Sequence, residues 1–230
     1  MKNRNLTVEQ FRNFAISMDF AESPGDMDST PPEGFLYQCG YLTLRKKTTN
    51  ELCLDYPNTE VLNSMSKLLT QNIVSENAYN NFRNALLSAL DNKNIENMVH
   101  VFNRLLASIP YDDYTKAINQ NFIFNDFRFP VQEWLYRSTI LAFMRGCGLN
   151  VSPEIHTNMG RSDLVIVHND VNWVIEIKVA YKGRKTAEKA KEALKQMETK
   201  NYANQYSNAV SIILVIDDAA RQIKKWEKVW

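Results

Sequence analysis

Two acids and a lysine stand out in a stretch of the sequence that otherwise alternates like buried strands. The segment "RSDLVIVHNDVNWVIEIK", residues 161–178, carries Asp163, Glu176 and Lys178. Glu176 and Lys178 are two residues apart, so on a strand their side chains project from the same face of the sheet. If "NDVN" is a hairpin turn, Val165 lies opposite Glu176 within one register step, and Asp163 comes close to Glu176.

Two carboxylates held this close repel one another unless a cation lies between them. Hard divalent ions such as Mg²⁺ bind one or two carboxylates, a carbonyl oxygen and water molecules. A lysine farther along the same face can act on the attacking water and stabilise the negative charge that develops on a phosphate oxygen. The trio of Asp163, Glu176 and Lys178 therefore predicts metal-dependent hydrolysis of phosphodiester bonds.

The elements that must position this trio follow the order αβββαβ. The hydrophobic pattern predicts, in sequence, a helix at 131–145 ended by Gly146 and Gly148, strands at 151–156, 163–168 and 173–179, a lysine-rich helix at 186–201, and a last apolar strand at 209–216. We therefore expect an α/β domain over residues 126–230.

The chain up to residue 125 is predicted to be a mainly helical region with a β-hairpin near 35–56. Leucines alternate with polar residues on both sides of the turn "KKTTNE", which is typical of a hairpin that begins at "FLYQCG". A short amphipathic helix is expected at 7–18. Apolar residues at three- and four-residue steps predict two or three core-facing helices between residues 58 and 120.

The composition is that of an ordinary globular protein, with 44% hydrophobic and 23% charged residues. A net charge of +1 argues against a protein that coats nucleic acid through bulk charge. Cys39, Cys53 and Cys147 lie far apart and are odd in number, so they suggest neither a disulfide framework nor a zinc knuckle. Neither a signal-peptide pattern nor a membrane-spanning apolar run occurs, so we expect a soluble, cytoplasmic protein.

The sequence resembles the PD-(D/E)XK nuclease superfamily, which has the restriction-endonuclease-like fold with an αβββαβ core. Asp163, the run Glu176-Ile177-Lys178 and the helix residue Glu133 carry this resemblance. The segments "GRSDLVI", "VIEIKV", "EALKQMETKNYA", "FLYQCGYLTL" and "YPNTEV" are most similar to the PD-(D/E)XK domain that ends a family of bacterial and archaeal proteins with an AAA-ATPase-like front part. The similarity runs from Phe35 to Ile216.

The resemblance implies roles for the residues of the trio and the residue between them. Asp163 and Glu176 would bind Mg²⁺ (or Mn²⁺), and Ile177 would contribute its backbone carbonyl. Lys178 would position or activate the attacking water. The implied activity is that of a metal-dependent nuclease.

Two helix residues receive roles from the resemblance as well. Glu133 would complete the metal shell through water, and Gln196 would turn toward the active site, with Tyr202 at the position of a family tyrosine. The plainer interpretation of Glu133 is an ion pair with Arg137 four residues on, and that of Gln196 is an ordinary helix-surface residue. The sequence departs from the family at Ser162, which replaces the proline before Asp163.

The resemblance implies a nucleic-acid substrate, and we expect DNA, although the residues themselves leave DNA and RNA open. The sequence has no GxxxxGK[ST] motif, so it is either the rear piece of a longer protein or a stand-alone relative. An ATPase domain, in cis or in trans, is an expected partner. The alternative function is a non-catalytic module that keeps the nuclease fold and binds a nucleic acid or a partner protein.

Overall fold

A five-stranded mixed sheet forms the centre of the C-terminal half. The computed structural model describes residues 14–16, 32–46, 52–109, 131–157, 160–181, 186–200 and 206–229. The strands stand in the order β4-β5-β6-β7-β8, with the bounds β4 Asn150–Thr157, β5 Gly160–His168, β6 Val171–Ala180, β7 Ala209–Asp217 and β8 Gln222–Lys228. Neighbouring strands are antiparallel except β6 and β7, which are parallel.

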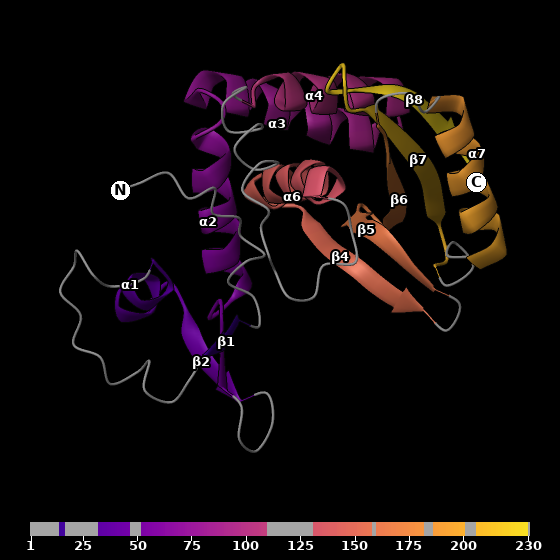
Figure 1. Cartoon of the computed structure of the whole chain (residues 1–230). Helices are drawn as coiled ribbons and strands as arrows, with labels where there is room; N and C mark the ends of the chain where they lie inside the picture. Colours follow the sequence, from indigo (N-terminus) through magenta and orange to yellow (C-terminus); the bar gives the residue numbers. More distant parts are fainter. Residues whose placement is uncertain are drawn as a thin grey trace.

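Helices cover both faces of this sheet (Figure 1). Helix α6, Val131–Gly146, packs on one face, and α7, Thr186–Lys200, packs on the other. The crossover through α7 allows β7 to run parallel to β6, because parallel neighbours need a long connection. The predicted α/β fold with its αβββαβ order is confirmed.

Successive side chains of β6 point to opposite faces of the sheet and so pack into two different cores. The larger core, on the α6 side, takes every second residue from Trp173 to Val179. The smaller core, beneath α7, includes Val174. Glu176 and Lys178 share the parity of Val174, so they leave the sheet on the face that α7 covers.

A two-residue turn joins β5 to β6 and sets their register. Asn169 and Asp170 have φ values of 46° and 60°, which this kind of turn requires and which Asn and Asp tolerate. The sequence predicts a four-residue turn with Val165 opposite Glu176, but Val165 pairs with Val174. The prediction is wrong by two residues, because the chain re-enters the sheet directly after Asp170.

The helical region packs on the same side of the sheet as α6. Helices α2 Thr59–Gln71, α3 Glu76–Asp91 and α4 Ile95–Ala107 match the predicted apolar spacing. Asn58, Ser75 and Asn94 cap them, each accepting a hydrogen bond from a first-turn N–H group. Apolar residues of α3 and α4 share one continuous core with α6 and the sheet. The division into domains at residue 125 stays a prediction, and this core spans both sides of it.

A small sheet in the order β1-β3-β2 lies beside the start of α2 (Figure 1). Strands β2 Thr43–Lys46 and β3 Leu52–Asp55 form the predicted hairpin. Strand β1, Phe14–Ile16, pairs with β3, where the sequence predicts part of a helix at 7–18. The helix prediction is wrong at these three residues, because strand pairing outweighs a short helical pattern. The rest of 7–18 lies outside the described residues.

The hairpin begins later than the sequence predicts. Residues from Pro32 to Gln38 form helix α1, although the pattern predicts that the strand begins at Phe35. Proline is favoured in the first turn of a helix, where its missing N–H group has no partner to lose. None of the helices in the described ranges is long and apolar enough to cross a membrane.

Strand β8 extends the sheet beyond β7, which the sequence predicts as the last strand. Its sequence, "QIKKWEK", is rich in lysine, as edge strands often are. The Asn103 side chain of α4 accepts a hydrogen bond from the Ile223 N–H over 2.7 Å and donates one to its carbonyl over 3.2 Å. Helix α4 thereby covers the first part of this edge.

Helices α2 and α6 lie directly against each other at Gly146. The sequence predicts Gly146 and Gly148 as helix stops, and α6 does end at Gly146. Gly148 has a φ of 84°, as a residue just beyond a helix end often does. A Cβ on Gly146 would lie 2.9 Å from the Lys67 Cα and 3.0 Å from the Tyr79 hydroxyl oxygen. The absence of a side chain therefore allows the close approach.

Substituting Gly146→Ala tests this contact. Alanine favours a helix over glycine by about 1 kcal/mol, but overpacking against the α2 backbone costs about 1–3 kcal/mol. We expect urea unfolding to show a free energy of unfolding lowered by up to about 2 kcal/mol, the balance of these two effects. A rise in stability would contradict the close approach, because it is the result for a helical glycine with open space around it.

Candidate active site

The register of β5 and β6 places the two predicted acids opposite each other, toward one end of the large sheet. Pairing between β5 and β6 extends to Leu164 and Ile175. One further step in the same register places Asp163 directly opposite Glu176. The two-residue turn thus produces the juxtaposition that the trio predicts, although through a different register.

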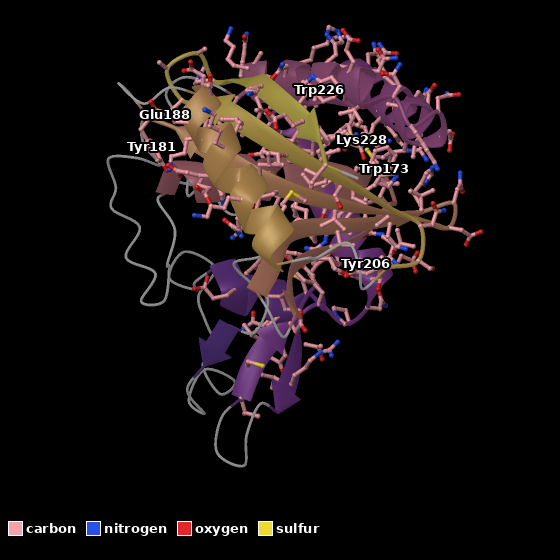
Figure 2. All side chains as sticks on the ribbon, turned by 90° about the vertical axis from the view of Figure 1, so that its right-hand side faces the viewer. Trp173, Tyr181, Glu188, Tyr206, Trp226 and Lys228 are labelled. Atoms are coloured by element: carbon pink, nitrogen blue, oxygen red, sulfur yellow. The ribbon has the colours of Figure 1, made fainter. Side chains whose placement is uncertain are left out.

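Helix α6 begins over the same end of the sheet. Tyr136 donates its hydroxyl hydrogen to Asp218 Oδ1 over 3.0 Å, directly after the end of β7. In Figure 2, Tyr181 and Glu188 mark this end of the sheet and Trp173 marks the opposite end of β6. Residues from β5, β6, α6 and α7 can therefore meet here.

Asp163 is held where β5 leaves β6. The β4–β5 pairing continues as far as Gly160, whereas the β5–β6 pairing stops at Leu164. The Asp163 carboxylate continues the ladder, since its Oδ2 accepts a hydrogen bond from the Ile177 N–H over 2.8 Å. The N–H and C=O groups of a strand residue point to the same side. The Ile177 carbonyl therefore faces the side of β6 on which Asp163 lies.

Glu176 and Lys178 form an ion pair within β6. The Lys178 Nζ donates to Glu176 Oε1 over 2.7 Å. The Glu176 side chain is 1% exposed and that of Lys178 is 18% exposed. The carboxylate is thus buried with its cation, and the ammonium lies between it and the surface.

Arg137 of α6 provides a cation for the other acid. Its Nη1 lies 3.6 Å from Asp163 Oδ1, and the two side chains are 9% and 7% exposed. The sequence suggests an ion pair between Arg137 and Glu133, which stays a prediction, and the structure also places the guanidinium near Asp163. Sequence reasoning did not assign Arg137 to the site, although its four-residue spacing from Glu133 already puts both on one helix face.

Glu133 borders the same group of charges. It is half-buried, and this burial raises the pKa of its carboxyl. The nearby charge of Lys178 lowers the pKa, Asp163 raises it, and Arg137 and Lys189 lower it. Glu133 is therefore a third carboxyl group at the site, and its pKa lies above the ordinary value.

Lys178 keeps its proton in this environment. Burial alone lowers the pKa of its ammonium group, but the carboxylates of Glu176, Asp163 and Glu133 together outweigh burial. The net result is a raised pKa. Lys178 is thus a positive charge at neutral pH and not a free base.

Helix α7 brings a further lysine within range of the acids. The Lys189 side chain is 14% exposed and pairs with Glu192, and its charge also acts on Glu133. Sequence reasoning missed Lys189, which looks like one of several lysines on a solvated helix. Gln196 is half-buried on the same helix, and its approach to the acids stays a prediction. Tyr202 lies outside the described residues.

The ligands present are suited to a hard divalent ion. No group of three or more His, Cys, Asp or Glu side chains close enough to hold a metal is found within the described ranges. The oxygen atoms that could bind a metal here are those of the Asp163 and Glu176 carboxylates and of the Ile177 carbonyl. These are the oxygen ligands that Mg²⁺ takes, with water completing its shell. The chemistry of the donors therefore fits the predicted metal.

The fold and the charged trio define a restriction-endonuclease-like domain, and comparison with known proteins agrees. Residues 131–226 match the model of the PD-(D/E)XK nuclease superfamily. This part of the chain, somewhat less than half of it, is therefore similar to that superfamily. No solved structure matches the chain significantly.

A longer protein is also similar to this chain. It comes from Azotobacter chroococcum mcd 1 and carries the name "Uncharacterized protein in vnfD 5'region". The two sequences are 27% identical over 196 residues, which cover 83% of this chain and 35% of the relative. The chain thus spans about a third of the length of the relative that it matches.

Replacing Lys178 with methionine tests the buried ion pair. Breaking such a pair leaves a buried charge and costs about 3–5 kcal/mol. Because the folded-state pKa of Lys178 is raised, the stabilisation is fully present below the ordinary lysine value of about 10.4 and is lost above it. We therefore expect wild type and Lys178→Met to differ by about 3 kcal/mol at pH 8, and the difference to shrink as the pH rises from about 10.4 through the raised folded-state pKa.

Lys225→Met serves as the matched control, measured by chemical denaturation in buffer without divalent ions. Lys225 pairs with Glu227 on β8 over the same 2.7 Å and the same two-residue spacing, but both side chains are about a third exposed. Exposed pairs contribute about 1 kcal/mol or less. Equal effects at Lys178 and Lys225 would show that burial adds nothing to the pair.

Proposed function

We propose that the protein is a divalent-metal-dependent nuclease that hydrolyses phosphodiester bonds in DNA. The observation that carries this proposal is the buried carboxylate of Asp163 opposite that of Glu176, with Lys178 on the same strand and face as Glu176. The superfamily match over residues 131–226 supports it independently, because the matched part contains all three residues.

Asp163, Glu176 and the Ile177 carbonyl would hold the metal. When bound, a Mg²⁺ or Mn²⁺ ion supplies Lewis acidity that stabilises negative charge on the phosphate and favours loss of a proton from water. The protein's contribution is to hold these ligands before substrate arrives: the Ile177 N–H fixes Asp163, and Lys178 fixes Glu176.

Lys178 and Glu133 would act on the reacting groups. The Lys178 ammonium orients the attacking water and stabilises charge on a phosphate oxygen. Glu133, with its raised pKa, is suited to accept the proton that the water loses. Water adds to phosphorus, the bond from phosphorus to the leaving 3′ oxygen breaks, and a 5′ phosphate and a 3′ hydroxyl result. Gln196 would contact the substrate from α7.

Further domains and partners are part of this proposal. The relative is more than twice as long as this chain, which leaves room for another domain, and we propose an ATPase, in cis or in trans, that delivers DNA to the site. Arg137, Lys178 and Lys189 place positive charge around the acids from α6, β6 and α7. Such cations suit a phosphodiester backbone.

A cleavage assay tests the activity. Purified protein is incubated with single-stranded, duplex and branched DNA, and with RNA, in Mg²⁺ or Mn²⁺. We expect cutting that EDTA abolishes, and a loss of about 10²–10³-fold in Glu176→Gln and Lys178→Met, since each removes a group that stabilises the transition state. Lys225→Met and Glu227→Gln are the matched controls, because they alter a pair with the same spacing on β8.

Two outcomes of this assay would overturn the proposal. Cutting that survives Glu176→Gln would identify a contaminating nuclease. Binding of nucleic acid without cutting, under each metal and on each substrate, would favour the non-catalytic module.

Metal binding gives a second, independent prediction. Asp163→Asn keeps an oxygen that can accept the Ile177 N–H but removes the negative charge. We expect Mn²⁺ affinity, measured by titration calorimetry, to fall by about 10²-fold or more, because even the loss of outer hydrogen-bond partners costs about 10–100-fold. Unchanged affinity would place the metal elsewhere in the protein.

A further inference from the structure

Each acid of the strand pair lies beside a cation of the protein. Glu176 is paired with Lys178, which belongs to the same strand. Asp163 is paired with Arg137, which comes from α6 on the opposite face of the sheet. The two cations reach the acid pair from different elements, so each can be changed without altering the other.

The placement of Arg137 calls for an explanation beyond packing. Its side chain is 9% exposed, and it lies against a carboxylate that is 7% exposed. A buried carboxylate needs a compensating charge, and here two further carboxyl groups, Glu176 and Glu133, lie nearby. Lys178, which is paired with Glu176, also acts on Asp163 and Glu133, so Arg137 adds a second cation, from another element, to this group of acids.

Both oxygens of Asp163 are occupied, in different ways. Oδ2 accepts the Ile177 N–H over 2.8 Å, a normal hydrogen-bond length. Oδ1 faces Arg137 Nη1 at 3.6 Å, which is the distance of a loose ion pair and not of a tight hydrogen bond. The backbone hydrogen bond fixes the orientation of the carboxylate, while the guanidinium supplies positive charge at the other oxygen.

We propose that Arg137 is a positioning residue that serves as the counter-ion of Asp163, keeping the acid pair assembled and weakening its hold on a divalent ion. This inference rests on the proposed function only for the presence of a metal. The pairing of Arg137 with Asp163 stands apart from it.

Removing Arg137 should change the metal affinity in the opposite direction to the removal of a residue that only orients a metal ligand. A divalent ion bound to Asp163 would have the guanidinium as a close, buried neighbour of the same charge sign, and repulsion between buried charges is strong. Removing the arginine should therefore tighten metal binding. Removing a residue that merely orients a ligand weakens metal binding.

Mn²⁺ titration of the full chain by calorimetry measures this effect. We expect Arg137→Met to bind Mn²⁺ about tenfold or more tightly than the wild type. Arg137→Lys keeps the positive charge and should stay within about threefold of the wild type. Unchanged or weaker binding by Arg137→Met would overturn the inference.

Arg83→Met is the control for the loss of a partly buried arginine. Arg83 donates to the Cys147 carbonyl over 3.3 Å, ten residues beyond Arg137 and therefore about 15 Å along α6. The Mn²⁺ affinity of Arg83→Met should equal that of the wild type. A similar tightening in Arg83→Met would trace the effect to general loosening of the fold and would overturn the inference.

A double-mutant cycle tests the pairing without any metal. Thermal unfolding in EDTA is compared for wild type, Arg137→Met, Asp163→Asn and the double variant. We expect Arg137→Met to lower the melting temperature much less in the Asp163→Asn background, because the charge that needs the arginine is gone. Equal losses in both backgrounds would overturn the inference.

The cycle also decides the case in which Arg137→Met does not fold. Folding of the double variant would support the counter-ion role, and failure of both would show that the arginine acts through packing. The metal titration distinguishes failure of the proposed function from failure of the counter-ion role of Arg137. A wild type that binds no Mn²⁺ would overturn the proposed function, whereas a wild type that binds it with no tightening in Arg137→Met would overturn the counter-ion role alone.

Discussion

The site depends on keeping two buried carboxylates side by side. Asp163 and Glu176 are 7% and 1% exposed at their side chains, so each would be strongly destabilised if it were left unpaired. Their cations, Arg137 and Lys178, make the arrangement stable before any metal or substrate is present. The surrounding structure can be understood as the means of bringing these four groups together at one end of one sheet.

The sheet does this by letting one ladder end early. Strand β5 pairs with β6 only from Leu164 onward, so Asp163 precedes this pairing, while β6 remains paired with β7 as far as Ala180. The main chain of β6 is therefore open toward β5 where Glu176, Ile177 and Lys178 lie. The Asp163 side chain accepts the hydrogen bond from the Ile177 N–H, which the backbone of a neighbouring strand would otherwise accept. One interrupted ladder thus positions an acid and, on the same side of β6, a carbonyl oxygen.

Local patterns in the sequence were sufficient for the sheet part of the site and insufficient for the helix part. Glu176 and Lys178 could be placed on one face because alternation along a strand is a local rule. The β5–β6 register could be predicted only to within two residues, because it depends on how Asn169 and Asp170 turn. The contact of Arg137 with Asp163 could not be predicted, since it depends on how α6 packs on the sheet, whereas the spacing along the helix indicates only Glu133.

Helix α6 joins the charged site to the helical region that precedes it. Its first turns supply Glu133 and Arg137, and its last residue, Gly146, lies against the backbone of α2. Residues of α3 and α4 share a core with α6 and the sheet, although these helices precede the part that matches the superfamily, residues 131–226. The position of Arg137 relative to Asp163 is therefore set partly by helices outside the matched range. A change at the α2–α6 contact can reach the acid pair through α6 itself.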